Sequence, residues 1–205
     1  MPAIPNAQLT HMGLFVNDPA VMVAFYTELF GFEVSDAGEF HGKHLTFLTR
    51  NTDEHHQLVL IRGRTAGPGE KLLGQVSFRV DTLADLRHFL RRSAELGATE
   101  HEARNHGNSW SIYFRDPDHN FIEMYVVTPW QVRQPWRVEL DLDLPDAEIE
   151  ALTKQLIDEA GVFVPLADWT REMAARIAAR SAGAAGTAGP AGPAGTAGPA
   201  GGDRS

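Results

Sequence analysis

Three side chains of the metal-ligand type stand at corresponding places in strand-like runs of this sequence. His11 lies in the alternating run LTHMGLFV, Gln75 in LGQVSFRV and Glu123 in FIEMYV. Successive side chains of a strand point to opposite faces of its sheet. If the apolar residues of each run pack against helices, the three polar side chains share the other face. An imidazole nitrogen, an amide oxygen and a carboxylate oxygen can together bind a divalent metal.

Three more residues close to these strands have side chains suited to acid–base chemistry. His106 and Tyr113 flank and enter one predicted strand, and His56 directly precedes another. A neutral imidazole is a natural proton acceptor near pH 7. Gln57 remains an alternative to His56 at this place, because a register shift of one residue exchanges the two faces of a strand.

An internal repeat predicts the elements that position these residues. The order strand, helix, three strands occurs twice, with strands expected at 9–16, 33–36, 44–49 and 57–61, and again at 73–80, 99–103, 109–115 and 121–126. The first helix begins at Asp18-Pro19, a good N-cap followed by Pro at the first helical position, and ends at Gly31. The second begins around Asp81-Thr82 and ends at Gly97. Two βαβββ modules predict an α+β fold whose mixed β-sheet curls into a cup.

The chain is expected to have three parts: a paired-module domain, a helical extension and a disordered tail. Their bounds are 1–127 (module one 9–61, linker 62–71, module two 72–127), 128–180 and 181–205. Two helical runs, about 145–160 and 166–180, place the extension on the sheet or on a partner chain. The tail has a glycine at every third position from Gly183 to Gly201, but it is too short and too poor in proline for a collagen helix.

Composition excludes several classes of protein. The chain has 205 residues, 43% hydrophobic and 22% charged, as in an ordinary globular domain. Its net charge of −9, with no clustered basic face, argues against a nucleic-acid partner. The absence of cysteine excludes disulfides and thiolate metal sites. With no signal peptide and no apolar run near the ~20 residues of a membrane span, we expect a cytoplasmic protein that does not contact a membrane.

The run from His106 to Glu123, HGNSWSIYFRDPDHNFIE, resembles the pattern of the extradiol ring-cleaving dioxygenases. That pattern joins a His, a hydrophobic–Tyr pair, an acidic–Pro turn and a Glu ligand. The pair His55-His56 resembles the His-His of the same enzymes. From Leu9 to Val127 the chain is therefore similar to one domain of the vicinal oxygen chelate (glyoxalase/bleomycin resistance/extradiol dioxygenase) superfamily.

The resemblance implies a metal centre whose ligands are His11, Gln75 and Glu123. The dioxygenases have a second His where this chain has Gln75, whereas glyoxalase I enzymes of the superfamily use Gln together with His and Glu. Fe(II) is the implied metal, with Mn(II) or Zn(II) as alternatives. The implied substrates are O₂ and a catechol-like aromatic diol.

The same resemblance implies roles for the remaining candidates. His56 would act as the acid/base, and His106 and Tyr113 would donate to the substrate oxygens. Arg104 and His119 depart from the pattern, His119 by replacing the glycine of a turn. Two other functions stay open: a glyoxalase-like metal-dependent isomerase or lyase, and a non-catalytic small-molecule binding (resistance) protein. Exposed sheet edges favour a homodimer.

Overall fold

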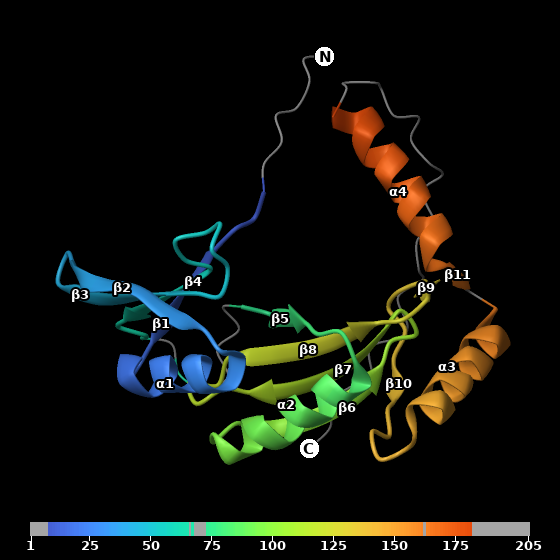
Figure 1. Ribbon diagram of the computed structural model, residues 1–205, viewed down its shortest axis with the longest axis horizontal. Helices are drawn as coiled ribbons and strands as arrows, with labels where there is room; N and C mark the ends of the chain where they lie inside the picture. The colour runs from blue at the N-terminus through green and yellow to red at the C-terminus, as the bar shows by residue number, and fades with distance from the viewer. Residues whose placement is uncertain (1–7, 66, 68–72, 162, 182–205) are drawn as a thin grey trace, which may run out of the picture. The chain divides into compact units, whose positions relative to one another are not determined.

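The computed structural model describes residues 8–65, 67, 73–161 and 163–181 (Figure 1). It divides into two compact units, residues 8–169 and a second unit to which the described residues 170–181 belong. Helix α4 (Leu166–Ser181) crosses this boundary. The predicted tail, apart from Ser181, and residues 66 and 68–71 of the predicted linker lie outside the described residues. The fold that follows is that of residues 8–169.

Both predicted βαβββ modules are present, which confirms the expected α+β class. The first consists of β1 (Met12–Val16), α1 (Pro19–Phe30), β2 (Glu33–Phe40), β3 (Lys43–Thr49) and β4 (Leu58–Arg62). The second consists of β5 (Val76–Arg79), α2 (Leu83–Glu95), β6 (Thr99–Asn105), β7 (Ser109–Arg115) and β8 (Phe121–Val127). The first strand of each module is shorter than predicted, so His11 and Gln75 each lie directly before a strand.

The module helices begin and end at residues that the sequence marks. The Asp18 carboxylate accepts hydrogen bonds from two backbone N–H groups of the first turn of α1, and Gly31 ends the helix with a φ of 67°. In α2, Thr82 and Asp85 cap each other's backbone N–H groups in a capping box. Local chemistry therefore determines both helix starts.

The strands form two mixed sheets of equivalent order. The first is β1-β4-β3-β2, and the second is β5-β8-β7-β6 with one further strand, β10, at its edge. In each module the first strand pairs in parallel with the last, and the other module pairs are antiparallel. Residues before β1 and within β5 border one cavity. This seam is where the two modules meet.

Alternation along the strands separates a core face from an opposite face, as predicted. Leu14 and Val16 are buried, whereas His11 and Phe15 are exposed. Helices α1 and α2 contact their own sheets and each other, and in Figure 1 both lie on the same side of the two sheets. The face that carries the candidate residues is consequently the face without these helices.

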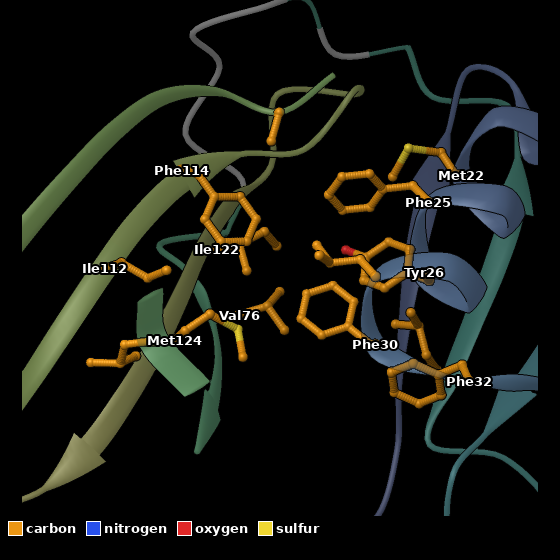
Figure 2. Close-up of a cluster of buried hydrophobic side chains, with 14 of the residues drawn as sticks. Met22, Phe25, Tyr26, Phe30, Phe32, Val76, Ile112, Phe114, Ile122 and Met124 are labelled. Atoms are coloured by element: carbon orange, nitrogen blue, oxygen red, sulfur yellow. The ribbon is translucent and has the colours of Figure 1, made fainter. Parts of the chain in front are cut away.

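Aromatic side chains join the two modules on the helix side. Figure 2 shows Phe25, Tyr26 and Phe30 of α1 directed toward apolar side chains of β7 and β8. The Phe30 ring stacks on Phe78 of β5 at a centroid distance of 4.4 Å. One hydrophobic core thus spans both modules, and neither could bury this surface alone.

The extension contains three short strands that the sequence did not predict, as well as the expected helix α3 (Asp146–Ala160). The strands are β9 (Trp130–Val132), β10 (Val138–Glu139) and β11 (Phe163–Pro165). Helix α3 packs on the second module, where the buried Thr153 hydroxyl accepts from Asn105 Nδ2 at 2.8 Å and from Trp110 Nε1 at 2.9 Å. None of the described helices has the length and apolar character to span a bilayer.

Candidate functional site

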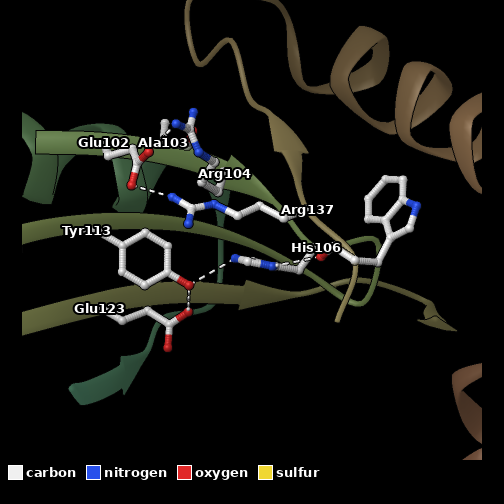
Figure 3. A network of polar contacts seen from close by, with 8 residues as sticks. Glu102, Ala103, Arg104, His106, Tyr113, Glu123 and Arg137 are labelled. Carbon is white, nitrogen blue, oxygen red and sulfur yellow. Dashed lines mark hydrogen bonds and ion pairs between the residues drawn. The ribbon is translucent and has the colours of Figure 1, made fainter. Parts of the chain in front are cut away.

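Glu123 is a buried carboxylate on β8, with 8% of its surface exposed. Its Oε1 accepts a hydrogen bond from the Tyr113 hydroxyl at 2.6 Å (Figure 3). Its Oε2 accepts from Ser77 Oγ at 2.6 Å and from Gln75 Nε2 at 2.7 Å. The structure therefore brings Gln75, Tyr113 and Glu123 together, although they lie directly before β5, in β7 and in β8.

Strand register explains why these side chains meet. Glu102 lies opposite Tyr113, Tyr113 opposite Glu123, and Glu123 beside Ser77. Directly opposite residues of paired strands project to the same face. One row across β6, β7, β8 and β5 thus places a carboxylate, a phenol, a second carboxylate and a hydroxyl in sequence.

His106 extends this row of polar contacts at the end of β6. Its Nε2 is 2.9 Å from the Tyr113 hydroxyl, and its Nδ1 is 3.0 Å from the backbone oxygen of Trp136. A carbonyl oxygen can only accept, so Nδ1 carries a proton. If Nε2 carries no proton, then Nε2 and the Glu123 carboxylate are two acceptors for the single hydroxyl proton of Tyr113. Burial, followed by the Glu123 carboxylate, raises the pKa of Tyr113 above its ordinary value.

His11 and His56 form a second group at the start of β1 and β4. Their ring centroids are 4.5 Å apart, and His56 Nδ1 lies 3.0 Å from Nδ1 of His55. Burial, and then the neighbouring His11 and His55 rings, lower the pKa of His56 below its ordinary value. His11 contacts His56, and no hydrogen bond joins it to Glu123.

A cavity of about 650 Å³ lies at the seam between β1 and β5, and among the six candidate residues only His11 lines it. His11 and Ser77 line it, and Ser77 also donates to Glu123. Four aromatic side chains also contribute to the lining: Phe30, Phe32, Phe78 and Phe89. Polar and charged side chains, including Arg50, Gln57 and Asp85, share the lining, and a cavity of this size can hold a small molecule.

The donor types of His11, Gln75 and Glu123 fit a divalent cation. Glu123 is buried, yet its three donors are neutral, and no ion pair among the described residues includes it. A buried carboxylate is normally compensated by a cation or a metal. In the described chain no three His, Asp or Glu side chains are grouped for metal binding. Gln75 directs its Nε2 at Glu123, so a cation at this place would need the amide turned to present its oxygen.

Sequence reasoning missed several residues that contact the candidate site. Ser77 shares the strand alternation of Gln75, so the signal for it was present. Trp136 and Arg137 come from the extension, which carries no local signal for a site. Arg137 has its guanidinium carbon 5.8 Å from the centroid of the Tyr113 ring and forms an ion pair with Glu102.

Comparison with known proteins follows the module boundaries. Residues 8–124 match the model of the Glyoxalase/Bleomycin resistance protein/Dioxygenase superfamily. Biphenyl-2,3-diol 1,2-dioxygenase 2 of Rhodococcus globerulus is 31% identical over 91 residues, which are 42% of this chain and 47% of that protein. Biphenyl-2,3-diol 1,2-dioxygenase 3 of the same organism is 29% identical over 125 residues, 58% of this chain and 63% of that protein. The match thus spans less than two thirds of either relative.

Solved structures with the same fold match the same portion of the chain. A glyoxylase/bleomycin resistance protein/dioxygenase domain from Frankia sp. EAN1pec is 21% identical with a TM-score of 0.52, covering 60% of this chain and 100% of that one. The fosfomycin resistance protein FosX from Listeria monocytogenes, in a monoclinic form, is 20% identical with a TM-score of 0.50, covering 60% and 96%. At this identity the likeness shows the fold alone.

Proposed function

Because the chain belongs to the glyoxalase/bleomycin resistance protein/dioxygenase superfamily, we propose that it is a metal-dependent extradiol-type dioxygenase that cleaves a catechol-like aromatic diol with O₂. The observation that carries this proposal is the hydrogen-bonded line from His106 through Tyr113 to Glu123. The Tyr113 hydroxyl, held between the His106 imidazole and the Glu123 carboxylate, offers a diol oxygen hydrogen-bond donors and acceptors. A protein that only sequesters an apolar ligand has no use for this line.

The proposed cofactor is Fe(II), with Mn(II) or Zn(II) as alternatives, held by His11, Gln75 and Glu123. Such a cation would chelate the two vicinal oxygens of the diol and favour loss of their protons. Ser77 and Tyr113 orient the Glu123 carboxylate by donating to its two oxygens. Supporting hydrogen bonds of this kind fix a ligand's orientation.

The other side chains would act directly on the substrate. His56, in ring contact with His11, would take a proton from a diol hydroxyl. His106 and Tyr113 would hydrogen-bond the substrate oxygens.

One observation favours a second candidate, a glyoxalase-like isomerase or lyase. Gln75 stands where the dioxygenase pattern has His, and a carboxamide is a weaker ligand than imidazole. In this alternative a metal-polarised carbonyl would lose a neighbouring proton to a carboxylate or imidazole of the same site.

Metal analysis of the anaerobically purified chain, followed by oxygen uptake with catechol and 2,3-dihydroxybiphenyl, tests the proposal. We expect near-stoichiometric iron and a yellow ring-cleavage product. The variant His11→Ala should lose metal and oxygen uptake together, whereas His88→Ala, at an exposed position of α2, should keep both. Bound zinc or manganese without oxygen uptake would favour the isomerase. Failure to bind any metal after reconstitution would exclude both enzymes and leave a binding protein.

A further inference from the structure

The segment from Gln134 to Arg137 is fixed to the candidate site. Gln134 Nε2 donates to the backbone oxygen of His106 at 2.9 Å, and the backbone oxygen of Trp136 lies 3.0 Å from His106 Nδ1. Arg137 forms an ion pair with Glu102, which lies opposite Tyr113 in the strand register. The extension thereby contributes side chains and backbone to the polar row of the second module.

One nitrogen of the Arg137 guanidinium donates a hydrogen bond, and the other two make none to the described residues. Its Nη2 donates to Glu102, and it makes no other hydrogen bond to the described residues. A guanidinium has five N–H donors in a planar fork. The side chain is 50% exposed, and the guanidinium lies near the Tyr113 ring, as Figure 3 shows. A planar cation that is fixed but mostly unpaired is suited to bidentate binding of a carboxylate.

The carboxylate that pairs with Arg137 does not fully neutralise the positive charge around it. Glu102 is shared between two guanidiniums, because Arg104 also pairs with it. Glu139 lies opposite Arg104 in β10, but it forms no ion pair among the described residues. An acidic chain of net charge −9 repels anions at long range, so binding one requires a local cation of this kind.

We propose that Arg137 binds a carboxylate substituent of the substrate, so that the preferred ligand is an anionic aromatic diol. This inference names the substrate class of the proposed function and rests on the same site. The Tyr113 hydroxyl marks where the diol oxygens would lie, and the guanidinium stands beside the ring of the same residue. With its diol oxygens at the Tyr113 hydroxyl, an aromatic ring that carries a carboxylate would direct that carboxylate toward the guanidinium. Arg104 positions Glu102, and Glu102 positions Arg137.

Binding calorimetry on the full chain with three probes tests this assignment: catechol, 3,4-dihydroxybenzoate and benzoate. The unaltered protein should bind 3,4-dihydroxybenzoate more tightly than catechol. Arg137→Gln should weaken binding of the carboxylated diol about 10- to 100-fold and leave catechol unchanged, because a charge-assisted, two-point contact is lost. Arg137→Lys should recover part of the preference, since it keeps the charge without the fork. Arg133→Gln, at an exposed position four residues earlier, is the matched control and should behave like the unaltered protein.

Two outcomes would overturn the inference. One is equal affinity for both diols, unaffected by Arg137→Gln. The other is equal weakening of catechol and 3,4-dihydroxybenzoate, as expected if Arg137 serves only to fix the extension near His106. Failure of the dioxygenase proposal is recognised separately, by the absence of oxygen uptake with any diol. Binding of benzoate that depends on Arg137 would then still establish the carboxylate site.

Discussion

His119 adopts a left-handed backbone conformation in the turn between β7 and β8, with a φ of 62°. Its side chain is exposed, and its backbone N–H donates to the backbone oxygen of Asp116 at 2.8 Å, so the turn itself imposes the left-handed conformation. Left-handed geometry costs an L-residue about 1–2 kcal/mol, and glycine escapes this cost while losing more entropy on folding.

We therefore expect His119→Gly to raise the free energy of unfolding by about 0.5–1 kcal/mol. Chemical denaturation at pH 7 measures the change. His119→Ala should not stabilise the fold, because alanine retains the steric cost at this φ. A glycine variant less stable than the alanine variant would contradict this account of the turn.

The candidate residues differ in how far the sequence could predict them. Tyr113 and Glu123 belong to adjacent strands of one module, so alternation places them on one face, and His106 directly follows the neighbouring strand β6. The position of Arg137 over Tyr113 depends on how a segment without periodicity returns to β6. Pairing of neighbouring strands can be predicted from the sequence pattern of the module, whereas the path of the extension back to β6 depends on tertiary contacts.

At the scale of elements, a buried hydroxyl links α3 to the second module, beside the ion pair of Asp146 with Arg87 and the buried Ile149. Thr153 Oγ1 accepts from Asn105 and Trp110 and donates to the Ile149 oxygen at 2.7 Å. Thr153→Val preserves the shape but leaves two buried donors without an acceptor. We expect a loss of about 2–4 kcal/mol in the free energy of unfolding, because each buried unsatisfied group costs about 1–3 kcal/mol.

Thermal and chemical denaturation of Thr153→Val check this expectation against Glu150→Ala, an exposed substitution on the same helix. The control should stay within about 0.5 kcal/mol of the parent protein. Indole fluorescence of Trp110 gives a second readout, since its Nε1 loses a partner. Equal stability of the two variants would show that the hydroxyl does not hold α3.

A second link between elements joins α1 to the β7–β8 turn. The Tyr26 hydroxyl donates to Asp116 Oδ2 at 3.1 Å, and both side chains are buried. Burial raises the pKa of Asp116 above its ordinary value, although hydrogen bonds from Asn120 and Tyr26 oppose the rise. The folded state therefore holds the proton more tightly than the unfolded chain. Stability from this group is present at low pH and decreases as pH rises through the folded pKa.

Tyr26→Phe should consequently destabilise the protein by about 1.5–3 kcal/mol at pH 7, where a hydrogen bond to a charged carboxylate is lost. The loss should be smaller near pH 4, where Asp116 is increasingly protonated. Unfolding free energies of the variant and the parent protein, measured at both pH values, give the comparison. A difference between variant and parent that does not change with pH would exclude the Asp116 carboxylate as the partner that matters.

Element boundaries were predictable where local chemistry ends an element. Asp18, Thr82 and Gly31 act on their own helices, and both helix starts agree with the sequence. The short strands β9, β10 and β11 have two or three residues each and show no periodicity. They exist because β10 pairs with β6 of the second module and β9 pairs with β11, contacts that no local pattern indicates.

For the whole molecule, the homodimer stays a prediction, and strand β2 is where we expect it to form. Every residue of β2 is exposed, including the apolar Val34 and Phe40, and β2 is an edge of its sheet. Light scattering should give a mass near twice 22.5 kDa. Val34→Lys should shift the mass toward the monomer, because a charge at an edge opposes strand pairing. A monomeric parent protein would refute the prediction.

The parallel pairing within each module has a consequence for the chain during its synthesis. Strand β1 hydrogen-bonds only to β4, and β5 only to β8, among the described strands. The opening strand of each module therefore waits for the closing strand of that module to emerge before it gains a partner. Until then its apolar side chains are available to chaperones or to a neighbouring chain. The last strand of each module is also the partner of its first strand. The nascent protein therefore exposes an unpaired first strand twice, once until Arg62 is made and again until Val127 is made.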